Sequence, residues 1–211
     1  MAVITVGSQT ELQSALKSAN GGDTIVLKDA NYGTLNITES YDSTVTITAQ
    51  NEGGAVFGDV VMNNSANLTF EGISVNAFRA YSSEGIGLKD STVDGIVYMK
   101  DIDGLSIENN DVAGNFHAML LNDVRDFVVK GNKIHGAQED LMRITGNSHG
   151  GEVSENFFFD TRPKDYRNDG DDSTSGYNHS DFIQMFGANG FTPHDITIRR
   201  NLMFDDRATG A

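Results

Sequence analysis

The sequence contains no cysteine, which excludes disulfide bonds, thiolate metal sites and a cysteine nucleophile. Proline is almost as scarce, at 2 residues, whereas glycine occurs 23 times. Many glycines among Asn, Asp, Ser and Thr residues are typical of frequent turns between short strands. No apolar run approaches the ~20 residues that a transmembrane helix needs. The N-terminus also lacks the basic and apolar segments of a signal peptide.

Positive charge is also scarce, with 15 Lys and Arg residues against 30 Asp and Glu residues and a formal net charge of −15. This balance argues against a nucleic-acid partner, which needs a basic face, and against an anionic membrane surface. Hydrophobic residues make up 38% of the 211 residues, enough for the core of one long domain. We expect an extracellular protein exported by a leaderless route, or a virion surface protein, and leave its oligomeric state open.

One segment, residues 10–19, has the apolar spacing of a helix, with Ser8 or Thr10 as its N-cap and Gly21 and Gly22 after its end. We therefore expect a helical cap over about residues 8–20. Short segments with alternating apolar residues follow and resemble one another. Their last apolar residue recurs every 18 to 24 residues, with one final step of 45, at Ile47, Phe70, Leu88, Ile107, Val129, Val153 and Ile198. This period predicts an all-β fold, a single-stranded right-handed parallel β-helix of roughly eight turns, whose stacked turns share one core.

Two further columns follow from the same register. Asparagine stands three residues after four of the recurring positions, at Asn110, Asn132, Asn156 and Asn201, and we expect these side chains to form a hydrogen-bonded ladder between turns. A second strand in each turn aligns Ile96, Met119, Met142 and Ile183, and also Tyr98, Leu121, Ile144 and Met185, as inward columns. The outward columns are then Val97, Leu120, Arg143 and Gln184, and Met99, Asn122, Thr145 and Phe186.

The period breaks over about residues 160–180, where a charged insertion separates two turns. A long loop on a regular scaffold is a common place for function. The chain ends in mid-turn, so we expect residues 1–211 to form one β-helix domain that is truncated at its C-terminal end.

The N-terminal segments, Thr10-Glu-Leu-Gln-Ser-Ala-Leu and Gly22-Asp-Thr-Ile-Val-Leu, resemble the opening of polysaccharide lyases of the chondroitinase B and alginate lyase type. The segments His179-Ser-Asp-Phe-Ile-Gln and Thr192-Pro-His-Asp resemble the β-helices of secreted, calcium-binding, alginate-epimerase-like bacterial proteins. The resemblance covers nearly the whole chain and implies the fold more strongly than the activity. Two departures are that no Asp precedes Pro193-His194, so no catalytic role is transferred to His194, and that the glycine/aspartate calcium repeats are missing.

Lyases and epimerases of uronic-acid polymers remove the proton next to a carboxylate, so they need a group that neutralises the carboxylate, a base and an acid. The insertion and the adjoining turn offer Arg143, Arg162, Lys164, Tyr166 and His179 as candidate catalytic residues, with Lys130 and His135 as further possibilities. Candidate sugar contacts are Tyr177, Phe182, Gln184 and Phe186. His117 is interpreted as a hydrogen-bonded residue at a turn. A hydrolase of the polygalacturonase type is less favoured, because its motifs are absent.

Calcium is the cofactor that the acidic residues suggest, since this ion prefers hard oxygen ligands at short spacing. Asp169, Asp171 and Asp172 are the first candidate ligands, and Asp140 with Asp181 are the alternative. A solvated acidic loop, and a structural pair neutralised by Arg143, are the competing interpretations. The histidines lack the spacing of a zinc site.

The sequence therefore predicts a protein that acts on, or binds, an acidic polysaccharide resembling alginate, by β-elimination or C5-epimerisation. The alternative is a non-catalytic carbohydrate-binding adhesin, or a structural β-helix domain of a larger protein. A basic pocket around Arg143, Arg162 and Lys164 would favour the enzyme, and a flat aromatic strip would favour the adhesin.

Overall fold

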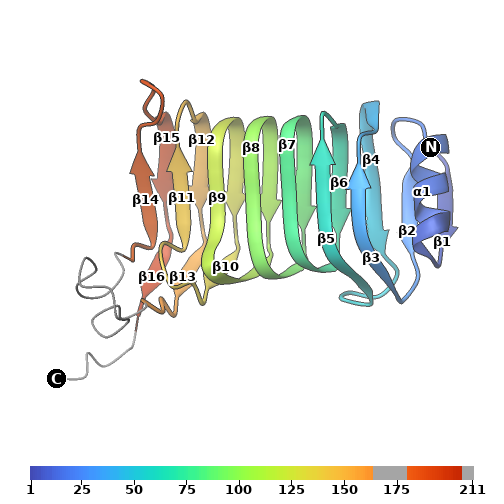
Figure 1. Ribbon diagram of the computed structural model, residues 1–211, viewed down its shortest axis with the longest axis horizontal. Coiled ribbons are helices and arrows are strands. Elements are labelled where there is room, and N and C mark those ends of the chain that lie inside the picture. Colours follow the sequence, from blue (N-terminus) through green and yellow to red (C-terminus); the bar gives the residue numbers. More distant parts are fainter. Residues whose placement is uncertain (164–179, 206–211) are drawn as a thin grey trace, which may run out of the picture.

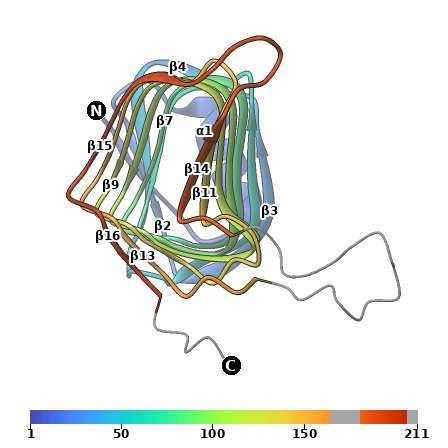
Figure 2. The ribbon, with the colours of Figure 1, turned by 90° about the vertical axis from the view of Figure 1, so that its left-hand side faces the viewer.

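The computed structural model describes residues 1–163 and 180–205 as a parallel β-solenoid of about seven turns with one short helix. The expected fold class is confirmed, and the number of turns is slightly below the expected eight. Strands from successive turns lie side by side along the long axis (Figure 1), and the end-on view shows the turns superimposed around one interior (Figure 2). The elements follow the order β1 (Val3–Val6), α1 (Gln9–Ser18), β2 (Thr24–Leu27), β3 (Ala30–Ile37), β4 (Ser40–Ala49), β5 (Ala55–Asn63), β6 (Ala66–Glu71), β7 (Ser74–Lys89), β8 (Thr92–Glu108), β9 (Asp111–Lys130), β10 (Lys133–His135), β11 (Met142–Thr145), β12 (His149–Ser154), β13 (Phe157–Phe159), β14 (Ile183–Phe186), β15 (His194–Arg199) and β16 (Leu202–Phe204).

Each turn contributes an extended segment to each of three faces, and the long strands β7, β8 and β9 bend through all of them. Face A contains β1, β2, β4, β6, β12, β15 and the last parts of β7–β9. Face B contains the first parts of β3, β5 and β7–β9, followed by β10, β13 and β16. Face C contains residues 60–63 of β5, 78–81 of β7, 97–100 of β8 and 119–122 of β9, followed by β11 and β14.

The helix α1 closes the N-terminal end of the core, as expected (Figure 1). Ser8 is its N-cap and accepts a hydrogen bond from the backbone N–H of Glu11. Leu12, Ala15 and Leu16 are buried on the face that packs against the solenoid, so the first turn does not expose its apolar side chains to solvent.

The recurring apolar positions form one inward column on face A, as predicted. Ile47, Phe70, Leu88, Ile107, Val129, Val153 and Ile198 pair in register from turn to turn. All are fully buried except Ile198, which is 43% exposed because it lies in the last turn that the structure describes. For the same reason Ile183 and Met185 of β14, which were predicted to point inward, are only partly covered.

The register differs from the prediction between β8 and β9. Gly95 pairs with Gly114 and Val97 pairs with Met119, so residues 115–118 of β9 face only Ile96 of β8. The extra residues move the β8 register by one position. Val97 and Met99 therefore point inward and are fully buried, whereas Ile96 and Tyr98 do not, contrary to the predicted columns. The same extra residues form a bend between faces B and C that carries Phe116 and His117.

The asparagine ladder lies at the bend between faces A and B. Asn132 Oδ1 accepts hydrogen bonds from the backbone N–H of Asn110 at 2.9 Å and from its side chain at 3.0 Å. The Asn132 side chain donates to the backbone oxygen of Ile107 at 2.9 Å and to Asn156 Oδ1 at 2.9 Å. Asn156 and Asn201 repeat the pattern, so buried backbone groups at this bend are paired across four turns.

We predict that Asn132→Ala lowers the free energy of unfolding by about 3 kcal/mol, because it leaves buried donors of Asn110 without an acceptor. Urea denaturation measures this change. Asn63→Ala is the matched control, since Asn63 is half-buried on face C and its side chain forms no hydrogen bond within the described residues. Equal denaturation midpoints for the two variants would contradict a structural role for the ladder.

Candidate functional site

The outward positions of face C carry three cationic side chains, although the chain as a whole is strongly acidic. Arg79, Lys100 and Arg143 are cations on three different turns of this face, and carboxylates lie at its edge, with Asp59 of β5 beside Arg79 and with Glu139 and Asp140 beside Arg143. We call these outward positions the cationic strip. Its members are Val61, Asn63, Arg79, Tyr81, Tyr98, Lys100, Leu120, Asn122, Arg143, Thr145, Gln184 and Phe186.

Lys100 is the cation of the strip that has no counter-ion. It is exposed and forms no ion pair within residues 1–163 and 180–205, whereas Arg79 pairs with Asp59 at 2.6 Å. Tyr81 pairs with Lys100 across adjacent turns, and the rings of Tyr81 and Tyr98 meet edge to face at 5.6 Å. The centre of face C therefore combines an unpaired ammonium group with aromatic rings and amide side chains.

Arg143 is held rigidly at the C-terminal part of the strip. Its Nη2 lies 2.8 Å from Glu139 Oε2, and its Nε donates to Asp140 Oδ2. Asp140 is fully buried, and its other oxygen accepts a hydrogen bond from the backbone N–H of Asp181 at 2.9 Å. The guanidinium also lies 5.8 Å from the ring centre of Phe186. These contacts fix the position of the Arg143 charge at the edge of face C.

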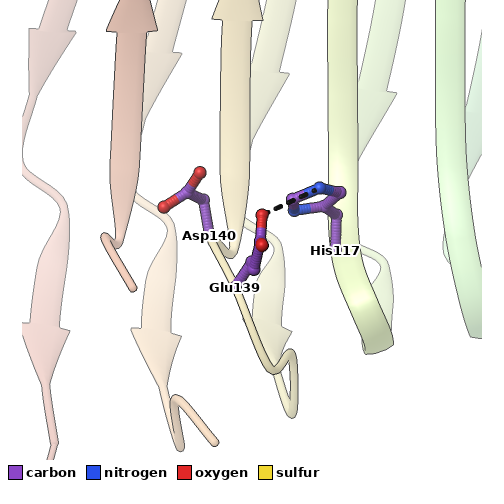
Figure 3. Close-up of side chains that lie close together, drawn as sticks. All are labelled: His117, Glu139 and Asp140. Atoms are coloured by element: carbon purple, nitrogen blue, oxygen red, sulfur yellow. Dashed lines mark ion pairs between the residues drawn. The ribbon is translucent and has the colours of Figure 1, made fainter. Parts of the chain in front are cut away.

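His117 lies beside this group on the preceding turn, with only 8% of its side chain exposed. Its Nε2 is 3.5 Å from Glu139 Oε2 (Figure 3), and its Nδ1 is buried and forms no hydrogen bond within residues 1–163 and 180–205. Burial lowers the pKa of His117, and the nearby Arg143 charge lowers it further, against the opposing effect of Glu139. Burial beside Arg143 therefore favours the neutral form of the imidazole.

His117, Glu139 and Asp140 form the candidate metal site among the described residues. Ligand atoms of His117, Glu139 and Asp140 all lie within 4.8 Å of one another. Both oxygens of Asp140 are already hydrogen-bonded, however, and Arg143 supplies the positive charge between the two carboxylates. The cluster also offers few oxygen ligands, and calcium requires six to eight. These residues do not fit calcium, and Asp140 meets Asp181 through a backbone N–H rather than as a pair of carboxylates.

A cleft of about 520 Å³ lies on the other side of the bend between faces B and C. It is lined by residues from five successive turns, among them Asn76, Asp94, Asn115, Gln138 and Arg162. The side chain of Arg162 is 60% exposed, and its Nε donates to Asp160 Oδ2 at 2.9 Å. Gln138 lines the cleft while the next residue, Glu139, contacts Arg143, so the two arginines lie on different surfaces on either side of the loop over residues 136–141.

The structure separates the candidate residues into three groups. Arg143, Gln184 and Phe186 lie on the cationic strip, as their predicted outward columns required. Arg162 lies in the cleft, and Phe182 packs partly buried against the core. The remaining candidates lie outside the described residues, namely Lys164, Tyr166, His179, Tyr177, Asp169, Asp171 and Asp172.

Sequence reasoning did not single out Arg79, Tyr98 or Lys100, and it interpreted His117 only as a turn residue. The available signal was the spacing of Arg79, Tyr98 and Arg143, but the extra residues 115–118 hide the shared register.

No protein-family model matches the chain, and no curated protein matches its sequence. Solved structures do match the fold. An alginate lyase from Paenibacillus sp. FPU-7 superposes with a TM-score of 0.74 at 17% identity, covering 96% of this chain and 76% of the lyase. Pectate lyase Pel9A has a TM-score of 0.69 at 15% identity, covering 95% of this chain and 62% of that protein. A pectate lyase from Bacillus sp. N165, solved with trigalacturonate, has a TM-score of 0.51 at 12% identity, covering 96% and 82%. At these identities the likeness shows the fold, which this chain shares with polysaccharide lyases.

We predict that Arg143→Met destabilises the fold by about 3–5 kcal/mol, because it leaves the fully buried Asp140 carboxylate without its cation. The double variant Arg143→Met/Asp140→Asn removes the buried charge as well, so we expect it to regain at least half of the loss. Urea denaturation of the parent and these two variants measures both effects. A double variant that is less stable than Arg143→Met would contradict the electrostatic explanation.

The lowered pKa of His117 predicts a pH dependence of stability. As the pH falls, the unfolded state takes up a proton near the ordinary histidine pKa of about 6.5, while the folded state does so only at lower pH. The unfolded state therefore binds more protons in this window, and the fold loses stability as the pH falls. His117→Gln should lose less stability than the parent between about pH 7 and pH 5, as measured by denaturation midpoints. Parallel curves for the two proteins would show that the imidazole is not held neutral.

Proposed function

We propose that this protein binds an acidic polysaccharide along the cationic strip of face C and acts on its uronate units by β-elimination or C5-epimerisation. The observation that supports this most is the charge of the strip. In a chain of net charge −15, Arg79, Lys100 and Arg143 share one flat face, and among the described residues Lys100 forms no ion pair there. A polyanion would be repelled by the rest of the surface and attracted here.

The geometry of the strip suits an extended polymer. Adjacent turns of a parallel sheet lie about 4.8 Å apart, so the three cations follow the long axis at intervals of one and two turns. Tyr81 and Tyr98 offer ring surfaces on the turns of Arg79 and Lys100, and Phe186 offers one on the turn after Arg143. Asn122, Thr145 and Gln184 offer hydrogen-bonding groups for hydroxyls. That solved structures with this fold include alginate and pectate lyases supports the same class of substrate.

The chemistry requires that the proton on C5, next to the uronate carboxylate, becomes acidic enough to leave. Arg143, held by Glu139 and Asp140, has the fixed charge that would pair with the carboxylate and stabilise the electrons left on it. We assign the proton transfers to Lys100 and Tyr98, two groups of the strip that carry exchangeable protons. In β-elimination, the base takes the proton as the C5–H bond breaks, the C4=C5 double bond forms, the C4–O4 bond breaks, and the departing O4 gains a proton. In epimerisation, a proton returns to C5 from the opposite side.

Calcium enters this proposal only through Asp169, Asp171 and Asp172, which lie outside the described residues. No step of the reaction is assigned to it. The described residues already provide the cations that a uronate carboxylate needs.

A second candidate function is binding without catalysis, as in an adhesin. The flat surface of face C favours it, because the Tyr81–Tyr98 pair and Lys100 lie on an open strand surface and do not line the cleft. Binding and catalysis are separated by the product. Elimination leaves an unsaturated uronate that absorbs ultraviolet light, epimerisation changes the proton spectrum of the polymer, and an adhesin produces neither change.

Lys100→Ala tests the strip, and Lys17→Ala is its matched control. Lys17 is likewise exposed and without an ion pair within the described residues, but it lies on α1 at the end of the solenoid. For alginate and pectate oligosaccharides at low salt, we expect Lys100→Ala to weaken binding about five- to tenfold, and added salt to weaken parental binding. Calorimetric titration measures both effects. Equal affinities for the two variants, or binding that is insensitive to salt, would exclude the strip as the polyanion site.

A further inference from the structure

The cleft between faces B and C has a chemistry different from that of the cationic strip. Its described charges are Asp94 and Arg162, and Arg162 is neutralised by Asp160. Asp94 is exposed and forms no ion pair within the described part of the chain. The cleft is therefore net negative where it is described, and a polyanion would be repelled from it. Its ligand must be uncharged or positively charged.

The floor of the cleft is backbone. Gly95, Gly114 and Gly136 stand at this bend in three successive turns, and all three line the cleft. A Cβ atom on Gly95 would lie 2.4 Å from the backbone oxygen of Asn76, and Gly136 has φ +82°, so neither position tolerates a side chain. The hollow is thus built into the turn geometry and is not an accident of side-chain rotamers.

The walls of the cleft carry groups that match hydroxyls. Asn115 has both an amide donor and an acceptor, and its side chain forms no hydrogen bond within the described residues. Asp94 is an acceptor, and Gln138 and Asn76 add amides, although the Asn76 side chain also donates to Asp59 at 3.0 Å. Such mixed donors and acceptors suit neighbouring hydroxyl groups better than a single cation.

An apolar ledge lies beside the cleft on face B. The outward column that carries Asp94 and Ala113 continues through His135 and Phe159 to Phe204. His135 Nε2 lies 2.8 Å from Asp111 Oδ1, and the His135 ring stacks on Phe159 with ring centres 4.5 Å apart. The ring of Phe157 also stacks on Phe159, again with ring centres 4.5 Å apart. Phe204 points outward, away from the core, in the last turn that the structure describes, and it is 55% exposed. Aromatic side chains next to a few convergent polar groups are the usual lining of a small-molecule site.

From this combination we infer that the cleft and its ledge form a second carbohydrate site, one that takes an uncharged saccharide. Hydroxyls bind Asp94 and Asn115 in the cleft, and the apolar faces of the sugar rings lie against Phe159 and Phe204. The site is separate from the cationic strip, from which the loop over residues 136–141 divides it, and it does not depend on the reaction proposed there.

Calorimetric titration of the whole chain with neutral cello-, manno- and malto-oligosaccharides tests this site. We expect at least one series to bind with an affinity that salt does not change, because no net charge is neutralised. Asp94→Ala should weaken that binding about tenfold, since it removes a charged acceptor, while Lys100→Ala should leave it unchanged. Unfolding midpoints confirm that each variant is folded.

A second pair of matched variants tests the apolar ledge. Phe204→Ser should weaken neutral-sugar binding, whereas Phe191→Ser should not, since Phe191 is also 55% exposed but lies in the turn after β14. The inference is overturned if no neutral series binds, if Lys100→Ala weakens binding more than Asp94→Ala, or if the two phenylalanine variants behave alike. Because the strip is tested with charged polymers, failure of one site is distinguishable from failure of the other.

Discussion

The whole molecule depends on the stacking of one turn on the next in register. A single turn has too few apolar residues to bury, but the inward columns on three faces combine into one core along the axis. The bends between faces would leave buried backbone groups unpaired, and the asparagine ladder supplies partners for them at the bend between faces A and B. Because inward positions are committed to the core, the outward positions are free to vary.

This division explains how an acidic chain gathers cationic side chains on one surface. Stacking places outward residues from distant parts of the sequence in columns about 4.8 Å apart. Arg79, Lys100 and Arg143 thus lie on one surface, with Asp59 beside Arg79 and with Glu139 and Asp140 beside Arg143 at its edge. The bend between faces B and C then separates two environments. On one side Glu139 and Asp140 fix the position of Arg143. On the other side lies the polar cleft, whose floor is formed by glycines and which adjoins the apolar ledge.

Much of this arrangement follows from periodicity alone. The spacing of apolar residues predicts the solenoid, the helical cap, the asparagine ladder and the pairing of Arg143 with Gln184, because each depends on a repeat that the sequence shows directly. Periodicity fails at residues 115–118, where extra residues shift the register and reverse the predicted direction of Tyr98. The isolation of Lys100 is also hidden in the sequence, since it depends on which carboxylates the neighbouring turns bring close. Most of the predicted site residues were assigned to the insertion because of its charge. The described site instead lies on the strands of face C and at the bend between faces B and C.

The central claim is that an acidic polysaccharide lies on face C. Acetylation of lysines in the presence and absence of alginate oligosaccharides, read by mass spectrometry, tests it most directly. Lys17, Lys28 and Lys100 form no ion pair within the described residues, and Lys100 alone of these lies on the cationic strip. The account predicts that the polymer protects Lys100 from acetylation and leaves Lys17 and Lys28 reactive. Equal modification of Lys100 with and without the polymer, or equal protection of all three, would contradict it.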